Sequence, residues 1–369
     1  MKYYIVAGER SGDLHASNLI KSIKQRDSEA EFRGFGGDYM ASAGAEIKVH
    51  IRDLAFMGFL EVLLGIFKIT KLMKVCQRDV LDYHPDVLIL VDYGGFNMKM
   101  AKWAKKNGVK VYYYISPKVW AWNTGRAKKL KATVDEMFVI LPFEKEFFKQ
   151  FDWDVHYVGN PVVDAVRAHV PSGDFVKKSG LPADKPIIAL LPGSRKQELI
   201  HMLPMFAEVA RQNRDLHFVV GAIKSLDTEL YAPALKEPNI SLVYDKTYDL
   251  YEVADAGIIT SGTATLETAL FGLPQVVAYR GSAISIWIAK KVAKIKFISL
   301  VNLIVGREVV RELIQEDMTP ESMTSELRNL LGGERRDEVF EGYRELNEVL
   351  GDTRASDKAA ETMLRLLRG

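Results

Sequence analysis

Short apolar runs alternate with amphipathic stretches along the first half of the chain. The strand-like runs are Tyr3–Ala7, Phe32–Phe35, Ile47–Ile51, Val87–Val91, Val109–Ile115, Met137–Leu141 and His156–Val158. The helical patterns are Asp13–Gln25, Leu60–Leu81, Met98–Lys106 and Phe143–Gln150. Several of the runs are apolar throughout, as is typical of strands covered on both faces. The repeated strand–helix order predicts a doubly wound parallel sheet, which is a Rossmann-like domain.

A polar stretch rich in proline and glycine, from Pro161 to Pro186, interrupts this pattern and is interpreted as a linker. The alternation then resumes with strands at Ile187–Leu191, His217–Val220, Ser241–Tyr244, Gly257–Thr260 and Gln275–Ala278, separated by helices at Gln197–Gln212, Leu226–Leu235 and Thr263–Phe271. We therefore expect two Rossmann-like domains, residues 1–165 and 186–345. A helical tail, Pro320–Leu367, follows, and we expect residues 346–369 to pack across the domains. Two such domains would face a cleft at the carboxyl ends of both sheets.

The composition agrees with a globular chain of about two domains. Of the 369 residues, 48% are hydrophobic and 27% charged, which argues against a disordered, collagen-like or coiled-coil protein. The single cysteine, Cys76, excludes an internal disulfide and a cysteine-based metal site, and it suits a reducing compartment. Met1 leads directly into Lys2–Val6 without the segments of an export signal.

Basic residues are concentrated in two tracts that contain no acid. Ten lie between Lys99 and Lys131, and six lie between Thr268 and Arg307. Such tracts are typical of proteins that bind nucleic acid or a membrane, and also of solvated helix faces. Charge alone leaves both interpretations open.

Two strand ends of the first half carry acidic residues. Gly8-Glu9-Arg10-Ser11-Gly12-Asp13 allows a tight turn, in which Ser11 or Asp13 could cap the following helix. The turn lacks the GxGxxG spacing, so a nicotinamide or flavin site is not favoured. Asp92 ends an apolar strand, where a catalytic base would face a cleft. The alternative is a helix-capping Asp92, although Asn97, directly before Met98, is the better candidate for that cap.

Two turns of the second half can bind phosphate. Gly193, Ser194 and Arg195 combine a tight turn with a cation, which suits a diphosphate. Gly262 and Thr263 open a helix whose first amides can hold phosphate, while Glu267, one turn further, can accept hydrogen bonds from a ribose. Each turn alone could be an ordinary strand–helix connection. The two together favour a nucleoside diphosphate.

An unusually apolar segment, Phe56–Phe67, carries one charge in twelve residues and is followed at helical spacing by Lys68, Lys71, Lys74 and Arg78. It is too short to span a bilayer, which needs about 20 residues, but it could lie in a membrane interface. Ile284–Ile298 has the same character. The alternative for both is a core helix with a charged outer face.

Taken together, these segments resemble the lipid-A-disaccharide synthases. The resemblance runs nearly end to end and rests on Val6–Asp13, Leu54–Val62, Ile115–Trp122, Leu141–Glu144, Leu190–Arg195, Ser261–Glu267 and Ser299–Leu303. It implies a GT-B glycosyltransferase of two Rossmann-like domains that needs no metal and no cofactor. The implied donor is UDP-2,3-diacylglucosamine and the implied acceptor is 2,3-diacylglucosamine 1-phosphate. Their condensation would invert the anomeric centre and release UDP.

The resemblance also implies roles for individual residues. Asp92 would be the base for the acceptor hydroxyl, Arg195 would contact the diphosphate, and Glu9 would face the sugar. The remaining nucleotide contacts would be Gly193, Ser194, Gly262, Thr263 and Asn302 to phosphate and Glu267 to ribose. The acyl chains or the inner leaflet would meet Met57, Phe59, Leu60, Leu63, Leu64 and Phe67, and lipid head groups would meet Lys68 and Lys71.

We accordingly expect a cytoplasmic protein that binds the inner face of the inner membrane peripherally and binds no nucleic acid. The resemblance also leaves a homodimer open, since some family members exchange their C-terminal parts. The alternatives are another UDP-N-acetylglucosamine enzyme of this fold, either a 2-epimerase or the peptidoglycan N-acetylglucosaminyltransferase, and a non-catalytic binding module.

Overall fold

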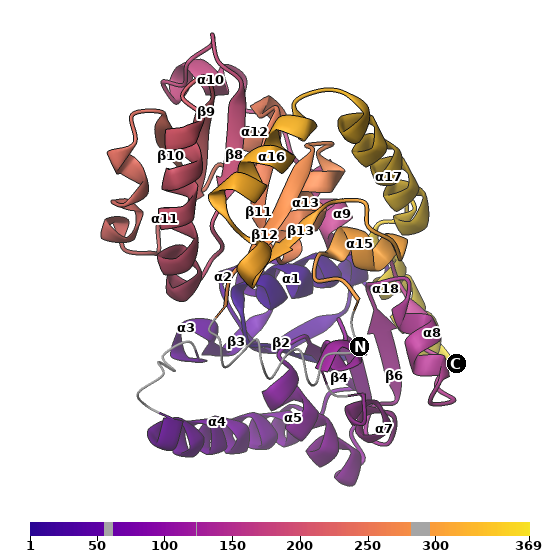
Figure 1. Cartoon of the computed structure of the whole chain (residues 1–369). Coiled ribbons are helices and arrows are strands. Elements are labelled where there is room, and N and C mark those ends of the chain that lie inside the picture. Colours follow the sequence, from indigo (N-terminus) through magenta and orange to yellow (C-terminus); the bar gives the residue numbers. More distant parts are fainter. Residues whose placement is uncertain (55–61, 123, 282–295) are drawn as a thin grey trace. The chain divides into compact units, whose positions relative to one another are not determined.

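The computed structural model describes residues 1–54, 62–122, 124–281 and 296–369 (Figure 1). The chain forms two compact units. Unit 1 comprises Met1–Pro161 together with Asp352–Gly369, and unit 2 comprises Val162–Gly351. Residues 352–369 thus belong to unit 1, and most of the stretch interpreted as a linker, residues 162–186, belongs to unit 2.

Unit 1 is built on a sheet of seven parallel strands in the order β3-β2-β1-β4-β5-β6-β7. The strands are β1 (Lys2–Ala7), β2 (Glu31–Gly36), β3 (Glu46–His50), β4 (Val87–Val91), β5 (Val111–Tyr114), β6 (Glu136–Val139) and β7 (His156–Tyr157). Each corresponds to a predicted run, so the parallel Rossmann-like sheet is confirmed.

Helices cover both faces of this sheet. They are α1 (Arg10–Lys24), α2 (Asp38–Ser42), α3 (Ile51–Leu54), α4 (Val62–Tyr83), α5 (Gly94–Lys106), α6 (Val119–Trp122), α7 (Arg126–Lys131), α8 (Glu144–Lys149) and α18 (Ala355–Arg368). Helix α5 begins four residues before the predicted start. Asn97 therefore lies inside the helix rather than at its cap, and the expectation of an Asn97 cap is wrong.

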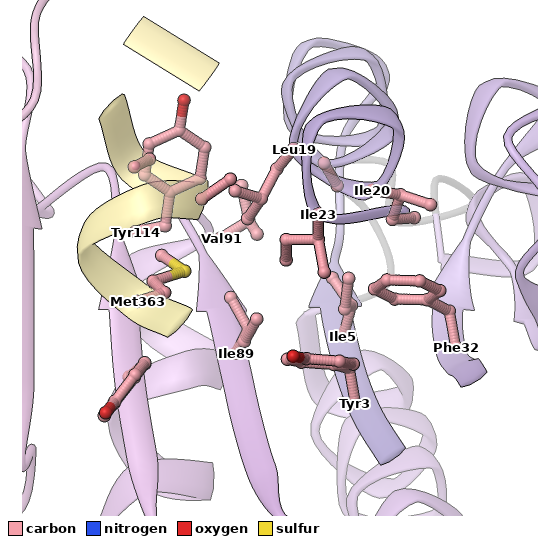
Figure 2. Close-up of a cluster of buried hydrophobic side chains, with 14 of the residues drawn as sticks. Tyr3, Ile5, Leu19, Ile20, Ile23, Phe32, Ile89, Val91, Tyr114 and Met363 are labelled. Carbon is pink, nitrogen blue, oxygen red and sulfur yellow. The ribbon is translucent and has the colours of Figure 1, made fainter. Parts of the chain in front are cut away.

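The core of unit 1 consists of two layers because successive strand side chains point to opposite faces. Tyr3 and Ile5 of β1 belong to one buried cluster, and Tyr4 and Val6 belong to the other. Figure 2 shows the first cluster, in which Met363 of α18 points toward Ile89. A fully buried side chain of this size stabilises the fold by about 1.5–3 kcal/mol.

Helix α18 packs on α1 within unit 1. Its apolar side chains Ala359, Ala360 and Met363 are buried in the cluster that α1 also lines. The Ser22 hydroxyl donates a hydrogen bond of 2.7 Å to Asp357, and Arg26 lies 3.5 Å from the same carboxylate. The C-terminal helix is therefore part of the unit 1 core.

Unit 2 is a second parallel sheet, with six strands in the order β10-β9-β8-β11-β12-β13. The strands are β8 (Ile187–Leu191), β9 (His217–Ala222), β10 (Ile240–Tyr244), β11 (Ala256–Thr260), β12 (Gln275–Tyr279) and β13 (Glu312–Ile314). The helices are α9 (Pro161–Arg167), α10 (Phe175–Lys178), α11 (Lys196–Gln212), α12 (Thr247–Val253), α13 (Thr263–Leu270), α15 (Leu300–Val305), α16 (Pro320–Leu330) and α17 (Glu334–Leu350). The expectation of a second Rossmann-like sheet is confirmed.

The predicted helix Leu226–Leu235 is wrong, because this segment forms two separate 3₁₀ turns, Thr228–Tyr231 and Ala234–Lys236. The Asp227 carboxylate caps the first turn by accepting the Glu229 N–H at 3.0 Å. Pro233 then supplies no N–H to continue it. The local capping and the proline explain why the apolar spacing does not extend into an α-helix.

Candidate active site

The loops of interest in unit 1 follow β1, β4, β5 and β6, which are neighbours in the sheet. Because these strands are parallel, their carboxyl ends meet at one edge. The edge gathers Glu9, Asp92, the loop Ile115–Trp120 and Glu144.

The turn after β1 is shaped by a close approach to the turn after β4. A Cβ added at Gly8 would lie 2.3 Å from atoms of the Tyr93 ring, so only glycine lets that ring contact the backbone. Glu9 follows at the N-cap of α1 and is exposed. Its side chain makes no cap hydrogen bond. The carboxylate is therefore available at the edge.

Asp13 does not cap α1, the helix in which it lies, as the sequence led us to expect. It is buried, and its carboxylate accepts the backbone N–H groups of Gly37, Tyr39 and Met40 at 2.7, 3.0 and 3.1 Å. These are the first amides of α2, so Asp13 caps the neighbouring helix. The interpretation of Asp13 as a cap of its own helix is corrected on this point.

Asp92 sits in a backbone turn that is uncommon for side-chain-bearing residues. It and Tyr93 have φ angles of 47° and 48°, in the left-handed region. Such conformations cost of order 1–3 kcal/mol each and persist where the surroundings hold them. Here the Asp92 carbonyl accepts from the Tyr113 hydroxyl at 2.7 Å and the Asn97 amide at 2.8 Å, and its N–H donates to Tyr114 at 3.0 Å.

The surroundings of Asp92 also change its acidity. Burial, followed by the neighbouring Glu9 carboxylate, raises the pKa of Asp92, while the Lys118 charge and the Tyr93 N–H lower it. A carboxylate with a raised pKa is a stronger base at neutral pH. Glu9 thus lies close enough to Asp92 for its charge to raise the pKa of that carboxyl.

Reasoning from individual residues did not single out the loop after β5. Ile115 is buried with φ 65°, a conformation in which a β-branched residue is a genuine outlier. Ser116 behind it is buried, and Lys118 is exposed. The run Ile115–Trp120 offered a signal only as part of the family resemblance.

Glu144 was also missed as a functional candidate. It is almost completely buried at the start of α8, and burial raises its pKa to about 7. The N–H groups of Ile140 and Leu141, which donate to its carboxylate at 3.2 and 2.9 Å, lower this pKa, as do the nearby polar groups of Ser116 and Trp120. An acid in the first turn of a helix is usually an exposed cap, so the sequence gives no indication of this burial.

In unit 2 the loops after the neighbouring strands β8 and β11 lie at one edge. Gly193 has φ 103°, which favours glycine. The Glu198 carboxylate accepts the N–H groups of Ser194 and Arg195 at 2.8 and 3.1 Å. Two of the amides expected to receive phosphate are therefore bonded to Glu198. The Arg195 side chain is 82% exposed and lies 3.3 Å from the same acid.

The turn after β11 leaves its helix end open. Gly262 precedes α13, and no described atom lies within 4 Å of a Cβ built there. Thr263 is exposed at the first helical position. Glu267 accepts the Tyr248 hydroxyl at 2.9 Å. Burial raises the pKa of Glu267, and this hydrogen bond lowers it.

Asn302, expected at the phosphates, is fully buried and fully bonded. Its amide donates to Val310 O at 2.8 Å and to Glu312 at 2.9 Å. Its carbonyl accepts the N–H groups of Val309 and Val310 at 2.8 and 3.0 Å. A phosphate contact by this side chain would have to replace bonds that join α15 to β13 and to the residues before it, so the expected role of Asn302 stays a prediction.

One group of residues in the described part of the chain has metal-ligand chemistry: His169, Asp249 and Glu252, with ligand atoms within 4.8 Å of one another. Asp249 already accepts the Ser172 N–H at 2.9 Å and lies 3.4 Å from Lys246. These partners balance its charge, and the group is an ion-paired cluster.

The predicted membrane segment lies partly outside the described residues, namely Met57, Phe59 and Leu60. Leu63, Leu64, Phe67 and Lys68 belong to the first turns of α4, where only the backbone is described. Lys71 is exposed. No helix in the described ranges is long and apolar enough to cross a bilayer.

Comparison with known proteins decides the family. The family model described as lipid-A-disaccharide synthetase matches residues 3–363. The chain belongs to this family. Like its relatives, this lipid-A-disaccharide synthetase family member is a glycosyltransferase enzyme of lipid A disaccharide synthesis.

Named members of this family match the chain over most of their length. It is 39% identical to the lipid-A-disaccharide synthase of Myxococcus xanthus, covering 98% of this chain and 97% of that protein. It is 36% identical to the enzyme of Coxiella burnetii, covering 89% and 88%.

Solved structures agree on the fold. The UDP-GlcNAc 2-epimerase of Neisseria meningitidis has a TM-score of 0.70 at 14% identity, covering 99% of this chain and 100% of that one. The glycotransferase of kitacinnamycin has a TM-score of 0.66 at 17% identity, covering 99% and 98%. At these identities the likeness supports the GT-B fold of this chain and nothing finer.

Proposed function

We propose that the protein transfers 2,3-diacylglucosamine from UDP to the 6-hydroxyl of 2,3-diacylglucosamine 1-phosphate. The bond from the acceptor oxygen to the anomeric carbon forms as the bond to the diphosphate breaks. The acceptor proton passes to Asp92, and UDP leaves. One displacement inverts the anomeric centre.

The single observation that carries this proposal is the environment of Asp92. Its backbone is held in a strained turn by three hydrogen bonds, and its pKa is raised by burial and by Glu9. A positioned base of this kind contributes typically about 10²–10⁴-fold to a rate. Glu9, at the same edge, is proposed to contact the sugar.

Unit 2 is proposed to hold the donor. The Arg195 guanidinium and the open first turn of α13, at Gly262 and Thr263, are the groups that suit the diphosphate. Gly193 and Ser194 shape the turn that carries Arg195. Glu267, positioned by Tyr248, suits the ribose hydroxyls.

The test of catalysis uses both acylated sugars and detects the disaccharide 1-phosphate by mass spectrometry. We expect product from the wild type and a loss of about 10²–10⁴-fold in kcat for Asp92→Asn, with UDP affinity retained. Asp82→Asn, an exposed acid of α4, is the matched control. Turnover of unacylated UDP-N-acetylglucosamine in place of the acylated sugars would indicate the epimerase or peptidoglycan enzyme instead.

We also propose a peripheral contact with the anionic inner face of the inner membrane. Support comes from α4, where Lys71, Lys74 and Arg78 are exposed at helical spacing while Met73 and Cys76 are buried. The preceding apolar segment, Met57–Phe67, is proposed to receive acyl chains.

Vesicle flotation tests this surface. Each basic residue near an anionic bilayer contributes ~1 kcal/mol, so Lys71→Glu with Lys74→Glu should weaken binding to phosphatidylglycerol vesicles by about 30-fold or more. Lys145→Glu with Lys149→Glu, on exposed positions of α8, should change binding much less. Equal losses in both variants would contradict the proposal. The homodimer that the family resemblance leaves open is tested by sedimentation: a mass near twice 41.6 kDa would show it, and a mass near 41.6 kDa would exclude it.

A further inference from the structure

The side chain of Asn97 contacts the backbone of the turn that carries Asp92. Asn97 lies in the first turn of α5 and is completely buried. Its Nδ2 donates to the carbonyl of Asp92 at 2.8 Å, to that of Val91 at 3.1 Å and to that of Val6 at 3.4 Å. Val6 belongs to β1 and Val91 to β4, so a single amide bonds the ends of both strands.

The orientation of this amide follows from its partners. All three are carbonyl oxygens, which only a donor can satisfy, so the reverse orientation would set the amide oxygen against them. In the orientation that results, the Asn97 Oδ1 is buried and has no hydrogen-bond partner among the described residues. Burying an unpaired oxygen is costly, and an aliphatic side chain of similar size would avoid that cost. Packing alone therefore does not account for an asparagine at this position, whereas the three carbonyls do.

A second buried side chain donates to the same Asp92 carbonyl. The Tyr113 hydroxyl reaches this oxygen at 2.7 Å from β5, the strand on the other side of β4 from β1. Tyr113 is also completely buried. The Asp92 carbonyl thus accepts two side-chain hydrogen bonds, and it belongs to a residue whose φ of 47° needs its surroundings to hold it.

We propose that Asn97 is a positioning residue for the transfer reaction: its amide, together with the Tyr113 hydroxyl, holds the backbone of Asp92 in the turn that places the Asp92 carboxyl. The inference rests on the proposed role of Asp92 as the base. Asn97 is buried and acts through the Asp92 carbonyl, without touching a substrate. Its bond to Val6 also fixes the end of β1, which Glu9 follows three residues later.

Two variants remove these contacts. Tyr113→Phe is the milder change, since it removes one hydroxyl and keeps the buried ring. Asn97→Ala removes all three bonds to the carbonyls. We expect kcat to fall by about 10- to 100-fold in each, because a misplacement of about 1 Å can cost that much. KM for the donor and the affinity for UDP should stay unchanged, because the donor is assigned to unit 2.

Matched controls separate positioning from a general loss of stability. Tyr4→Phe removes a buried hydroxyl of the same core cluster, which donates to Asp79 at 2.8 Å. Asn239→Ala removes a buried amide that also donates to three backbone carbonyls, at 2.9, 3.1 and 3.1 Å, at the amino end of β10. Both controls should lower the melting temperature as their counterparts do, because each loses buried hydrogen bonds, but both should keep the kcat of the wild type.

A double-mutant cycle with Asp92→Asn gives a readout that a merely structural role would not move. If Asn97 and Tyr113 act through Asp92, adding either substitution to Asp92→Asn should lower kcat no further. Losses as large in the Asp92→Asn background as in the wild type would overturn the proposal, and so would a normal kcat in both single variants. If Asn97→Ala fails to fold, Tyr113→Phe carries the same test.

Amide hydrogen exchange at Asp92, followed by NMR, separates this inference from the proposed function. The Asp92 N–H donates to the Tyr114 carbonyl at 3.0 Å, so its exchange reports opening of the turn. Exchange should be about 2- to 10-fold faster in Tyr113→Phe, and faster still in Asn97→Ala, whether or not the protein makes product. Unchanged exchange in both variants would refute the positioning role alone. Faster exchange in a protein that forms no disaccharide would refute the proposed reaction and leave the contact with the Asp92 turn standing.

Discussion

The buried Glu144 makes a quantitative prediction about stability. Its pKa in the folded protein is about 7, against the ordinary glutamate pKa of 4.5, and burial is the main cause. The folded state therefore binds more protons than the unfolded chain between these two values. Stability must fall as the pH rises through this window, by about 1.4 kcal/mol per pKa unit, or about 3 kcal/mol in all.

Glu144→Gln removes this titration while keeping the shape of the side chain. The difference in unfolding free energy between the variant and the wild type should therefore change by about 3 kcal/mol in favour of the variant between pH 4 and pH 8. Other acids titrate in both proteins and cancel in the difference. A constant offset from altered hydrogen bonds cancels as well, because only the pH dependence is compared.

Urea unfolding followed by tryptophan fluorescence is a suitable assay, since Trp103, Trp120 and Trp153 all belong to unit 1. Glu146→Gln serves as the control and should track the wild type. Parallel pH curves for Glu144→Gln and the wild type would refute the reasoning, as would a wild type that gains relative stability with rising pH.

Three further predictions concern the two strand-end sites. Glu9→Gln removes a charge that raises the pKa of Asp92, so the acid limb of the kcat/KM profile should move to lower pH; a shift to higher pH would contradict the assigned contact. Gly8→Ala places a Cβ 2.3 Å from the Tyr93 ring, so the variant should lose about 1–3 kcal/mol of stability in thermal unfolding and should turn over more slowly. Adding Tyr93→Ala to Gly8→Ala should restore part of the stability. Unchanged melting and turnover in Gly8→Ala would be inconsistent with this packing. Arg195→Ala removes an exposed side chain, so the free energy of unfolding should change by less than about 0.5 kcal/mol while kcat falls by about 10²–10³-fold. A large loss of stability with normal kinetics would mean that Arg195 stabilises the fold and does not act in catalysis.

The sequence predicted the sheets well because both faces of each strand are buried. Runs such as Val87–Val91 and Ile187–Leu191 are continuously apolar, and the structure has strands with those same bounds. β13, with three residues, is too short to produce such a run. The segment Leu226–Leu235 has apolar spacing, but Asp227 and Pro233 end its turns locally.

The candidate site was predictable only where chemistry coincides with a strand end. Asp92 follows one apolar strand directly and Arg195 lies in the turn after another, so their positions could be predicted from the sequence. The Asp13 side chain accepts a hydrogen bond from a residue 24 positions away, and the Asn302 side chain donates hydrogen bonds to residues 8–10 positions away. Local sequence patterns do not reveal such partners. Glu144 resembles an ordinary first-turn acid, and the local pattern gives no sign that its side chain is buried.

The central claim, that unit 2 binds the UDP of the donor at two strand-end turns, is tested most directly by a crystal structure with UDP. We expect the diphosphate within hydrogen-bond distance of the Arg195 guanidinium and of the first turn of α13, with the ribose on Glu267. Nucleotide anchored away from both Arg195 and Glu267 would contradict the account.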